Sequence, residues 1–232
     1  MLTDSSLGAA RRPEGVFGVG LSLLGVAVLR AARWWSRRVD SLGRRNAFPA
    51  ISVGLCVLLG SGALGNVAVH RHTEHRLAAA ATALVGTRVS VHCQTFAEAW
   101  MDVGPELGVV PFGPDGVPEH HTLIKWGTCR TLAGWLRSDH SHPTLDQVIA
   151  VHVLTHEAMH MAGSRDEAVT ECRAMQRDAR TALLLGATAP QAHALAATYW
   201  REVYPRMNQD YRTPNCAPGG SLDEHLPDAP WN

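Results

Sequence analysis

An uncharged run of 23 residues, 47–69, constrains this chain more than any other feature. It reads AFPAISVGLCVLLGSGALGNVAV and contains no charged side chain. A helix of that length, at about 1.5 Å per residue, crosses a hydrocarbon core of about 30 Å. A secretory signal would have a shorter apolar segment close to the N-terminus, whereas 46 residues precede this run. We therefore predict a transmembrane helix over residues 47–69.

The arginines before this run predict which end of the transmembrane helix faces the cytoplasm. Residues 30–45 carry six arginines and two tryptophans, the pattern of a cytoplasmic juxtamembrane segment. The apolar run 15–29 has only 15 residues, so it could be either a short membrane span or a segment at the membrane interface. The chain would then cross the membrane twice or once. We predict a cytoplasmic Arg-rich segment over residues 1–46, with 15–29 as a short membrane helix in the two-pass alternative. Residues 70–232 then form an extracytoplasmic domain.

The charge composition argues against nucleic acid as a partner. The chain of 232 residues has 21 basic and 21 acidic residues, so its net charge is near zero. Eight arginines fall before residue 46, where the membrane segment accounts for them. An apolar content of 46% and the remaining length suffice for one compact domain. We expect the membrane to be a partner, and no nucleic acid.

Four of the five cysteines follow the predicted span, and only Cys56 lies inside it. Four thiols in an exported domain predict two disulfides, whereas free thiols are typical of the cytosol. Three pairings exist for four cysteines. Because neighbours along the chain tend to pair, we prefer Cys93 with Cys129 and Cys172 with Cys216. None of the four has the CxxC spacing of a zinc-cysteine cluster.

The pattern after residue 70 predicts an α+β domain that is mainly helical. Alternating, β-branched residues at 87–95 predict a strand, and a Gly-Pro-Asp-Gly turn within 108–126 predicts a hairpin, which together make a small β-sheet. Helices are expected at 70–85 (a stalk or the first helix of the domain), 127–138, 144–162, 164–185 and 188–204. Thr144, Ser164 and Thr188 can cap three of them, and the C-terminal tail would be held by Cys216.

The helix over 144–162 contains the sequence His-Glu-Ala-Met-His. Its two imidazoles, His156 and His160, are four residues apart, so they lie on one helical face and suit one metal ion. Glu157 beside the first histidine can accept a proton from water at the metal. Gly163 then ends the helix, so the chain can turn back toward the metal.

Zinc held by two histidines needs a third protein ligand, and an outer acceptor for an imidazole nitrogen. Asp166 and Glu167 follow the helix, and Glu171 comes one turn after Glu167. The four-residue step from Glu167 to Glu171 reproduces a ligand with its outer acceptor, which favours Glu167 as the ligand. The stretch Ser164–Glu167 is also a capping box, in which Glu167 would only close a helix start.

These residues resemble the gluzincin branch of the zincin metallopeptidases, whose motifs are H-E-x-x-H and N-E-x-x-S-D. The resemblance implies His156, His160 and Glu167 as ligands of Zn²⁺ and Glu157 as the general base. It implies Glu171 as the carboxylate that accepts a hydrogen bond from a zinc-binding histidine. The compact HEAMHMAGSRD also resembles the metzincin pattern H-E-x-x-H-x-x-G-x-x-H/D, in which the residue after Arg165 would be the ligand instead of Glu167.

The resemblance implies a zincin-like fold and a membrane-anchored, extracytoplasmic, zinc-dependent metallopeptidase. It would hydrolyse peptide bonds of a peptide or protein substrate through a metal-activated water. The alternative is a non-catalytic zinc-binding or partner-binding module of the cell envelope, whose metal has no open position. An intramembrane protease would need the motif within a span, but Asp146 and the helix caps predict a soluble helix.

Other polar residues are expected to have lesser roles. His152 lies one turn before His156, but successive residues on that face drift by about 40°, so three histidines of one helix do not converge on one ion. We expect His152 to be a packed or surface histidine. His120 and His121 fall at an exposed strand end, and packing is the expected role of Tyr199, Tyr204 and Tyr211.

Overall fold

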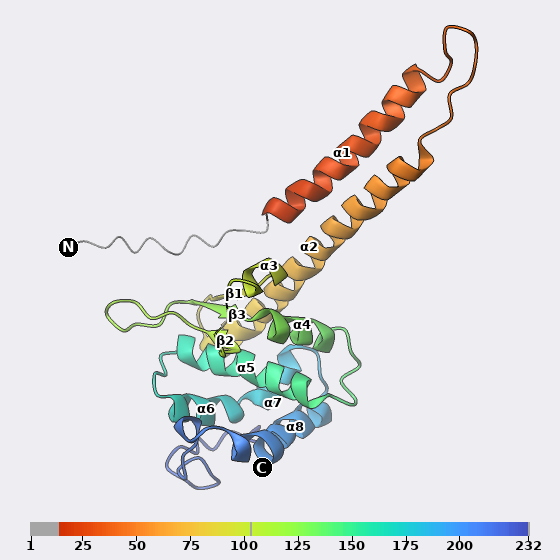
Figure 1. Cartoon of the computed structure of the whole chain (residues 1–232). Helices are drawn as coiled ribbons and strands as arrows, with labels where there is room; N and C mark the ends of the chain where they lie inside the picture. The colour runs from red at the N-terminus through yellow and green to blue at the C-terminus, as the bar shows by residue number, and fades with distance from the viewer. Residues whose placement is uncertain (1–13, 103, 232) are drawn as a thin grey trace, which may run out of the picture. The chain divides into compact units, whose positions relative to one another are not determined.

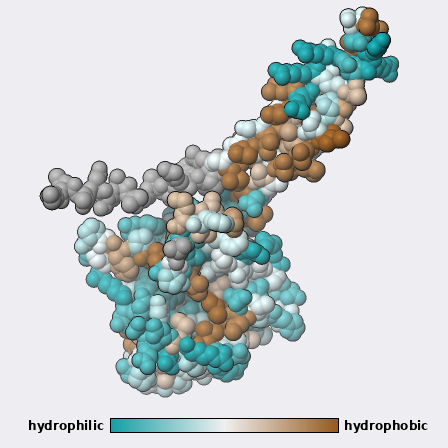
Figure 2. Space-filling view, in the orientation of Figure 1, coloured by the Kyte–Doolittle hydropathy of each residue, from teal (hydrophilic) through white to brown (hydrophobic). Residues whose placement is uncertain are grey.

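The computed structural model describes residues 14–102 and 104–231, and it divides into an N-terminal unit that ends at Arg71 and a C-terminal unit that begins at His72. Figure 1 shows the order of the elements along the chain. The N-terminal unit consists of α1 (Glu14–Ser36) and the first part of α2 (Ala50–Val85). Both helices are long and apolar enough to cross a membrane. Hydrophobic side chains cover much of their surface (Figure 2).

The short run 15–29 therefore belongs to a helix that is longer than the run itself. Arg30–Ser36 extend α1 to 23 residues, which is a spanning length. Inside this unit α1 and α2 approach closely at two glycines. A Cβ placed on Gly60 would lie 2.9 Å from the Cγ atom of Leu24, and one placed on Gly20 would lie 3.0 Å from the side chain of Leu64. Small residues at such positions allow two membrane helices to pack together.

The C-terminal part of α2 is the first helix of the folded domain and not a separate stalk. The helix continues without a break to Val85, and Leu77, Ala80 and Ala81 are buried in the hydrophobic core of the C-terminal unit. Gly86, with φ of 81°, then ends the helix in a conformation that side chains rarely adopt.

The small sheet has three strands in the order β1-β3-β2. β1 (Ser90–Cys93) is parallel to β3 (His121–Ile124), and β2 (Gly108–Val109) is antiparallel to β3 at the edge of the sheet. The predicted strand and the predicted hairpin are both confirmed. Gly116, with φ of 70°, lies in the turn of the Gly-Pro-Asp-Gly sequence.

Helices make up the rest of the C-terminal unit. They are α3 (Phe96–Ala99), α4 (Trp126–Trp135), α5 (Leu145–Met161), α6 (Glu167–Met175), α7 (Asp178–Leu184) and α8 (Ala189–Thr198). The predicted capping boxes at Thr144 and Thr188 are confirmed. Nearly every side chain from Val148 to Met161 is buried, so α5 runs through the core. A rigid central helix is a suitable support for a functional site.

The single helix predicted over residues 164–185 is wrong, because the structure has α6 and α7 with a break after Met175. The side chain of Gln176 binds the C-terminal tail there: its Nε2 donates to the Leu222 carbonyl at 2.9 Å, and its Oε1 accepts from the Glu224 amide at 2.8 Å. The predicted cap is wrong too. The Asp166 carboxylate, and not the Ser164 hydroxyl, accepts from the Val169 amide at 2.9 Å.

The end of the next helix also differs from the prediction. Instead of continuing to Tyr204, α8 ends at Thr198 and the chain widens into a π-helical turn over Tyr199–Val203. Two 3₁₀ turns follow, Tyr204–Arg206 and Gln209–Tyr211. Tyr199, the first residue of this wider turn, donates its hydroxyl hydrogen to the carboxylate of Glu171.

Both preferred disulfide pairings are confirmed. Cys93–Cys129 joins β1 to α4, and Cys172–Cys216 ties the C-terminal tail to α6. Cys56 in α2 is free. Two disulfides fit a domain that folds outside the cytoplasm.

Candidate metal centre

Three side chains from α5 and α6 bring their ligand atoms together. The Nε2 atoms of His156 and His160 are 3.0 Å apart. The Glu167 Oε2 atom lies 3.1 Å from the first and 3.4 Å from the second. A tetrahedral zinc ion with ligands at about 2.0–2.2 Å has ligand atoms roughly 3.3 Å from one another. The three atoms therefore match one face of such a tetrahedron.

The hydrogen bonds on the far side of both imidazoles direct lone pairs into this triangle. His160 Nδ1 lies 2.9 Å from the Ser164 carbonyl, which can only accept, so Nδ1 is the donor. His156 Nδ1 lies 3.0 Å from Glu171 Oε2, again an acceptor when ionised. In neutral rings both Nε2 atoms then lack a hydrogen. Two such lone pairs and a carboxylate about 3 Å apart are the donor set of a cation site.

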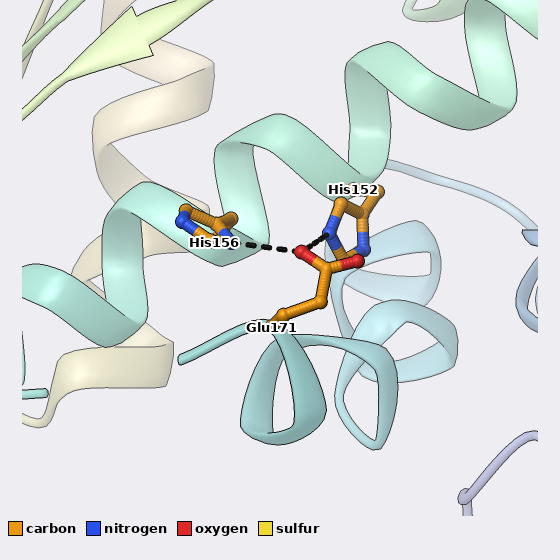
Figure 3. Close-up of side chains that lie close together, drawn as sticks. All are labelled: His152, His156 and Glu171. Atoms are coloured by element: carbon orange, nitrogen blue, oxygen red, sulfur yellow. Dashed lines mark hydrogen bonds and ion pairs between the residues drawn. The ribbon is translucent and has the colours of Figure 1, made fainter. Parts of the chain in front are cut away.

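Glu171 is the centre of a buried polar network behind His156. Its Oε2 lies 2.9 Å from His152 Nε2, and its Oε1 accepts from the Tyr199 hydroxyl at 2.7 Å. His152 Nδ1 in turn lies 2.9 Å from Asp178 Oδ2. Figure 3 shows that His152 and His156 approach Glu171 from the same helix. Glu171 and Asp178 are fully buried, and His152 is 3% exposed.

The ionised groups in this network stabilise one another. Burial disfavours the charged form of His152, but Asp178 and Glu171 outweigh burial and raise its pKa to about 10. Burial likewise disfavours the ionised form of Glu171, yet His152 and His156 outweigh that effect and hold its pKa well below the usual range. These directions favour an ionised Glu171 beside a protonated His152, whereas burial raises the pKa of Asp178.

Glu157 lies on the other side of the ligand triangle, against the edge strand β2. It is 5% exposed, and its Oε2 has no hydrogen-bond partner among the described residues. A Cβ on Gly108 would lie 2.8 Å from both Cγ and Oε1 of Glu157, so only glycine leaves room for this carboxyl group. Burial raises the pKa of Glu157 to about 7. A carboxyl group with that pKa can both accept and release a proton near neutral pH.

A cavity of about 480 Å³ opens over these groups. Its walls include both candidate histidine ligands, Glu157, Glu167, residues of β2 and Tyr211. Volumes of this size are typical of sites for small molecules or a few residues of a peptide.

The two candidates for the third ligand lie in different surroundings. Glu167 forms a metal-compatible group with the two histidines. Asp166 is exposed and its carboxylate caps α6, so it is not directed at the histidines. His121 is exposed and pairs with Glu119 at 3.0 Å, away from the cavity.

Sequence reasoning did not identify Asp178, Tyr199 or Gly108 as parts of this site. His152 is packed, as expected, but it also bonds to Glu171. Its position one turn before His156 was the available signal. No comparable signal existed for Asp178, because the break between α6 and α7 that orients it was not predicted.

The comparisons with known proteins found no relative. No protein-family model matches the chain, and no curated protein or solved structure is significantly similar to it.

Proposed function

We propose that this chain is a membrane-anchored, extracytoplasmic, zinc-dependent metallopeptidase. The observation that carries the proposal is one arrangement: His156, His160 and Glu167 present three ligand atoms 3.0–3.4 Å apart, and the Glu157 carboxyl lies in the same cavity. The gluzincin-like motif supports the peptidase assignment and a zincin-like fold. Zinc is favoured because two imidazoles and one carboxylate with an open position are a common catalytic zinc set.

The chain's own residues divide the work of hydrolysis. Zinc, when bound, supplies Lewis-acid chemistry: it polarises a carbonyl oxygen and lowers the pKa of water. The two histidines and Glu167, which line the cavity, would hold the ion. Glu157 accepts a proton from the water that attacks the peptide carbonyl carbon. It then delivers that proton to the leaving amine nitrogen as the C–N bond breaks.

The apolar helices and the disulfides support the proposed location. α1 and α2 are long enough to anchor the chain, and four of the six arginines that favour the cytoplasmic side lie in the connection between them. Both disulfides lie after the second helix, where an oxidising compartment would keep them.

Metal content and hydrolysis measured together test this proposal. The detergent-solubilised full chain should hold one zinc ion and cleave members of a random peptide library. Chelation should abolish cleavage, and one equivalent of Zn²⁺ should restore it. Zinc binding without cleavage of any library peptide would favour the non-catalytic envelope module instead.

A further inference from the structure

We infer that His152, Asp178 and Tyr199 are positioning residues for the metal ligand His156, acting through Glu171. The inference rests on the metal site of the proposed function, although it does not depend on which bond that site cleaves. It concerns three side chains that are fully buried or nearly so, two of which, His152 and Tyr199, also line the deep part of the cavity.

Proton accounting supports this role. Both ring nitrogens of His152 lie 2.9 Å from carboxyl oxygens. An ionised carboxylate can only accept, so His152 Nε2 donates to Glu171, and the hydrogen bond between Nδ1 and Asp178 holds the ring in place. Glu171 receives three donors in all, from His152, His156 and the Tyr199 hydroxyl. A carboxylate with three fixed donors is held in one orientation.

The orientation of Glu171 determines that of His156. Glu171 Oε2 accepts from His156 Nδ1, which leaves Nε2 without a hydrogen and turned toward His160 and Glu167. A carboxylate oxygen that accepts from Nδ1 makes the imidazole a better donor to a cation through Nε2. The network therefore strengthens metal binding without touching the metal.

The same cluster does not make a second metal site. His152, His156 and Glu171 also satisfy the distances of a cation group. A neutral imidazole, however, has one nitrogen free of hydrogen, and His156 uses that nitrogen toward His160 and Glu167. An ion at Glu171 would need the other nitrogen as well. We therefore assign one ion per chain, with Glu171 as a hydrogen-bond acceptor.

A matched pair of tyrosines provides the test. Tyr199→Phe removes the hydroxyl that donates to Glu171. Tyr204→Phe removes the hydroxyl of a tyrosine that is also buried, 7% exposed against 1% for Tyr199, and whose hydroxyl bonds to the backbone of Thr213 at 3.1 and 3.2 Å. The zinc dissociation constant of the detergent-solubilised full chain is measured against a chromophoric chelator, and near-UV circular dichroism verifies folding.

Tyr199→Phe should bind zinc about tenfold more weakly or worse, the range typical of lost outer hydrogen bonds, and Tyr204→Phe should bind like the parent. Asp178→Asn, which keeps the shape and replaces the carboxyl group that bonds His152 by an amide, should weaken zinc binding as well. Its effect should be less than additive with that of Tyr199→Phe, because both act through Glu171. If Asp178→Asn does not fold, the comparison of Tyr199→Phe with Tyr204→Phe still tests whether the network strengthens zinc binding.

Equal zinc affinities in the two tyrosine variants would overturn the inference, and so would two zinc ions per chain in the parent protein. A parent that binds one zinc but cleaves no peptide would refute the proposed function and leave the inference standing. A parent that binds no zinc would refute both.

Discussion

Gly108 of β2 and Glu157 of α5 are in such close contact that a Cβ on the glycine would lie 2.8 Å from the Oε1 atom of the glutamate. The edge strand therefore sets the position of the carboxyl group proposed to transfer protons. Because Glu157 is not one of the three proposed ligands, a change at Gly108 tests proton transfer apart from metal binding.

Gly108→Ala should consequently keep zinc and lose most hydrolysis. The added methyl group displaces Glu157 from the cavity, and removal of a general base typically costs about 10²–10⁴-fold in rate. Gly127→Ala in α4 is the matched control, because a Cβ there meets no atom within 4 Å. Steady-state cleavage and zinc content are measured for both. Full activity in Gly108→Ala would show that hydrolysis does not require Glu157 to stay in its present position against Gly108.

The neighbouring acidic residues should have separable roles. Glu167→Gln should weaken zinc binding strongly, because one of three protein ligands is lost. Asp166→Asn should bind zinc like the parent and lose at most about 1 kcal/mol of stability, since asparagine still caps α6. Zinc titration and thermal unfolding distinguish the two effects. The reverse pattern, with Asp166→Asn unable to bind zinc, would favour the metzincin-like arrangement.

Acid should weaken the attachment of the C-terminal tail at Glu224. Burial alone would raise the pKa of Glu224, but the guanidinium groups of Arg177 and Arg173, at 2.5 and 3.0 Å, outweigh burial and lower it. Because the pKa is lower in the folded state, these ion pairs stabilise the fold above the ordinary carboxyl pKa. Their contribution is lost as the pH falls through the folded value.

Glu224→Gln should therefore be less stable than the parent at neutral pH, by about 1 kcal/mol or less for such partly exposed pairs. The difference should disappear in acid, where the parent carboxylate is protonated too. Thermal unfolding of both proteins across a pH series measures it. A difference that stays constant at every pH would mean that the charge of Glu224 is not what holds the tail.

The arginines and the disulfides make one joint prediction about topology. A reporter enzyme fused after Asn232 should be active only if it works outside the cytoplasm. Under non-reducing denaturation only Cys56 should react with a maleimide, because Cys93–Cys129 and Cys172–Cys216 are closed. Cytoplasmic reporter activity, or labelling of all five cysteines, would contradict the proposed orientation.

Apart from the disulfides, the features that sequence predicted correctly depend on residues close together in the chain. The capping boxes at Thr144 and Thr188 and the shared face of His156 and His160 each lie within one or two helical turns. Local geometry determines such features, so a pattern of residue types is sufficient to find them. The disulfide pairing was found because neighbouring cysteines did pair.

The features that sequence missed depend on distant contacts. The break after Met175 is stabilised by the tail, through bonds from Gln176 to residues 46 and 48 positions away. Asp178 meets His152 only because that break exists, and Gly108 meets Glu157 across 49 residues. No spacing rule predicts such pairs. At the break after Met175, tertiary contacts override the helix propensity of the sequence.

Glu157→Gln tests the central claim most directly, because it changes one proton-transfer group and no proposed ligand. The variant and the parent are purified in detergent, and zinc content and peptide cleavage are measured on the same samples. The proposed mechanism predicts one zinc ion in both proteins, cleavage by the parent, and a loss of at least about 10²-fold in Glu157→Gln. Cleavage by the variant at the parent's rate would contradict the role of Glu157 and with it the assignment of this site as a metallopeptidase centre.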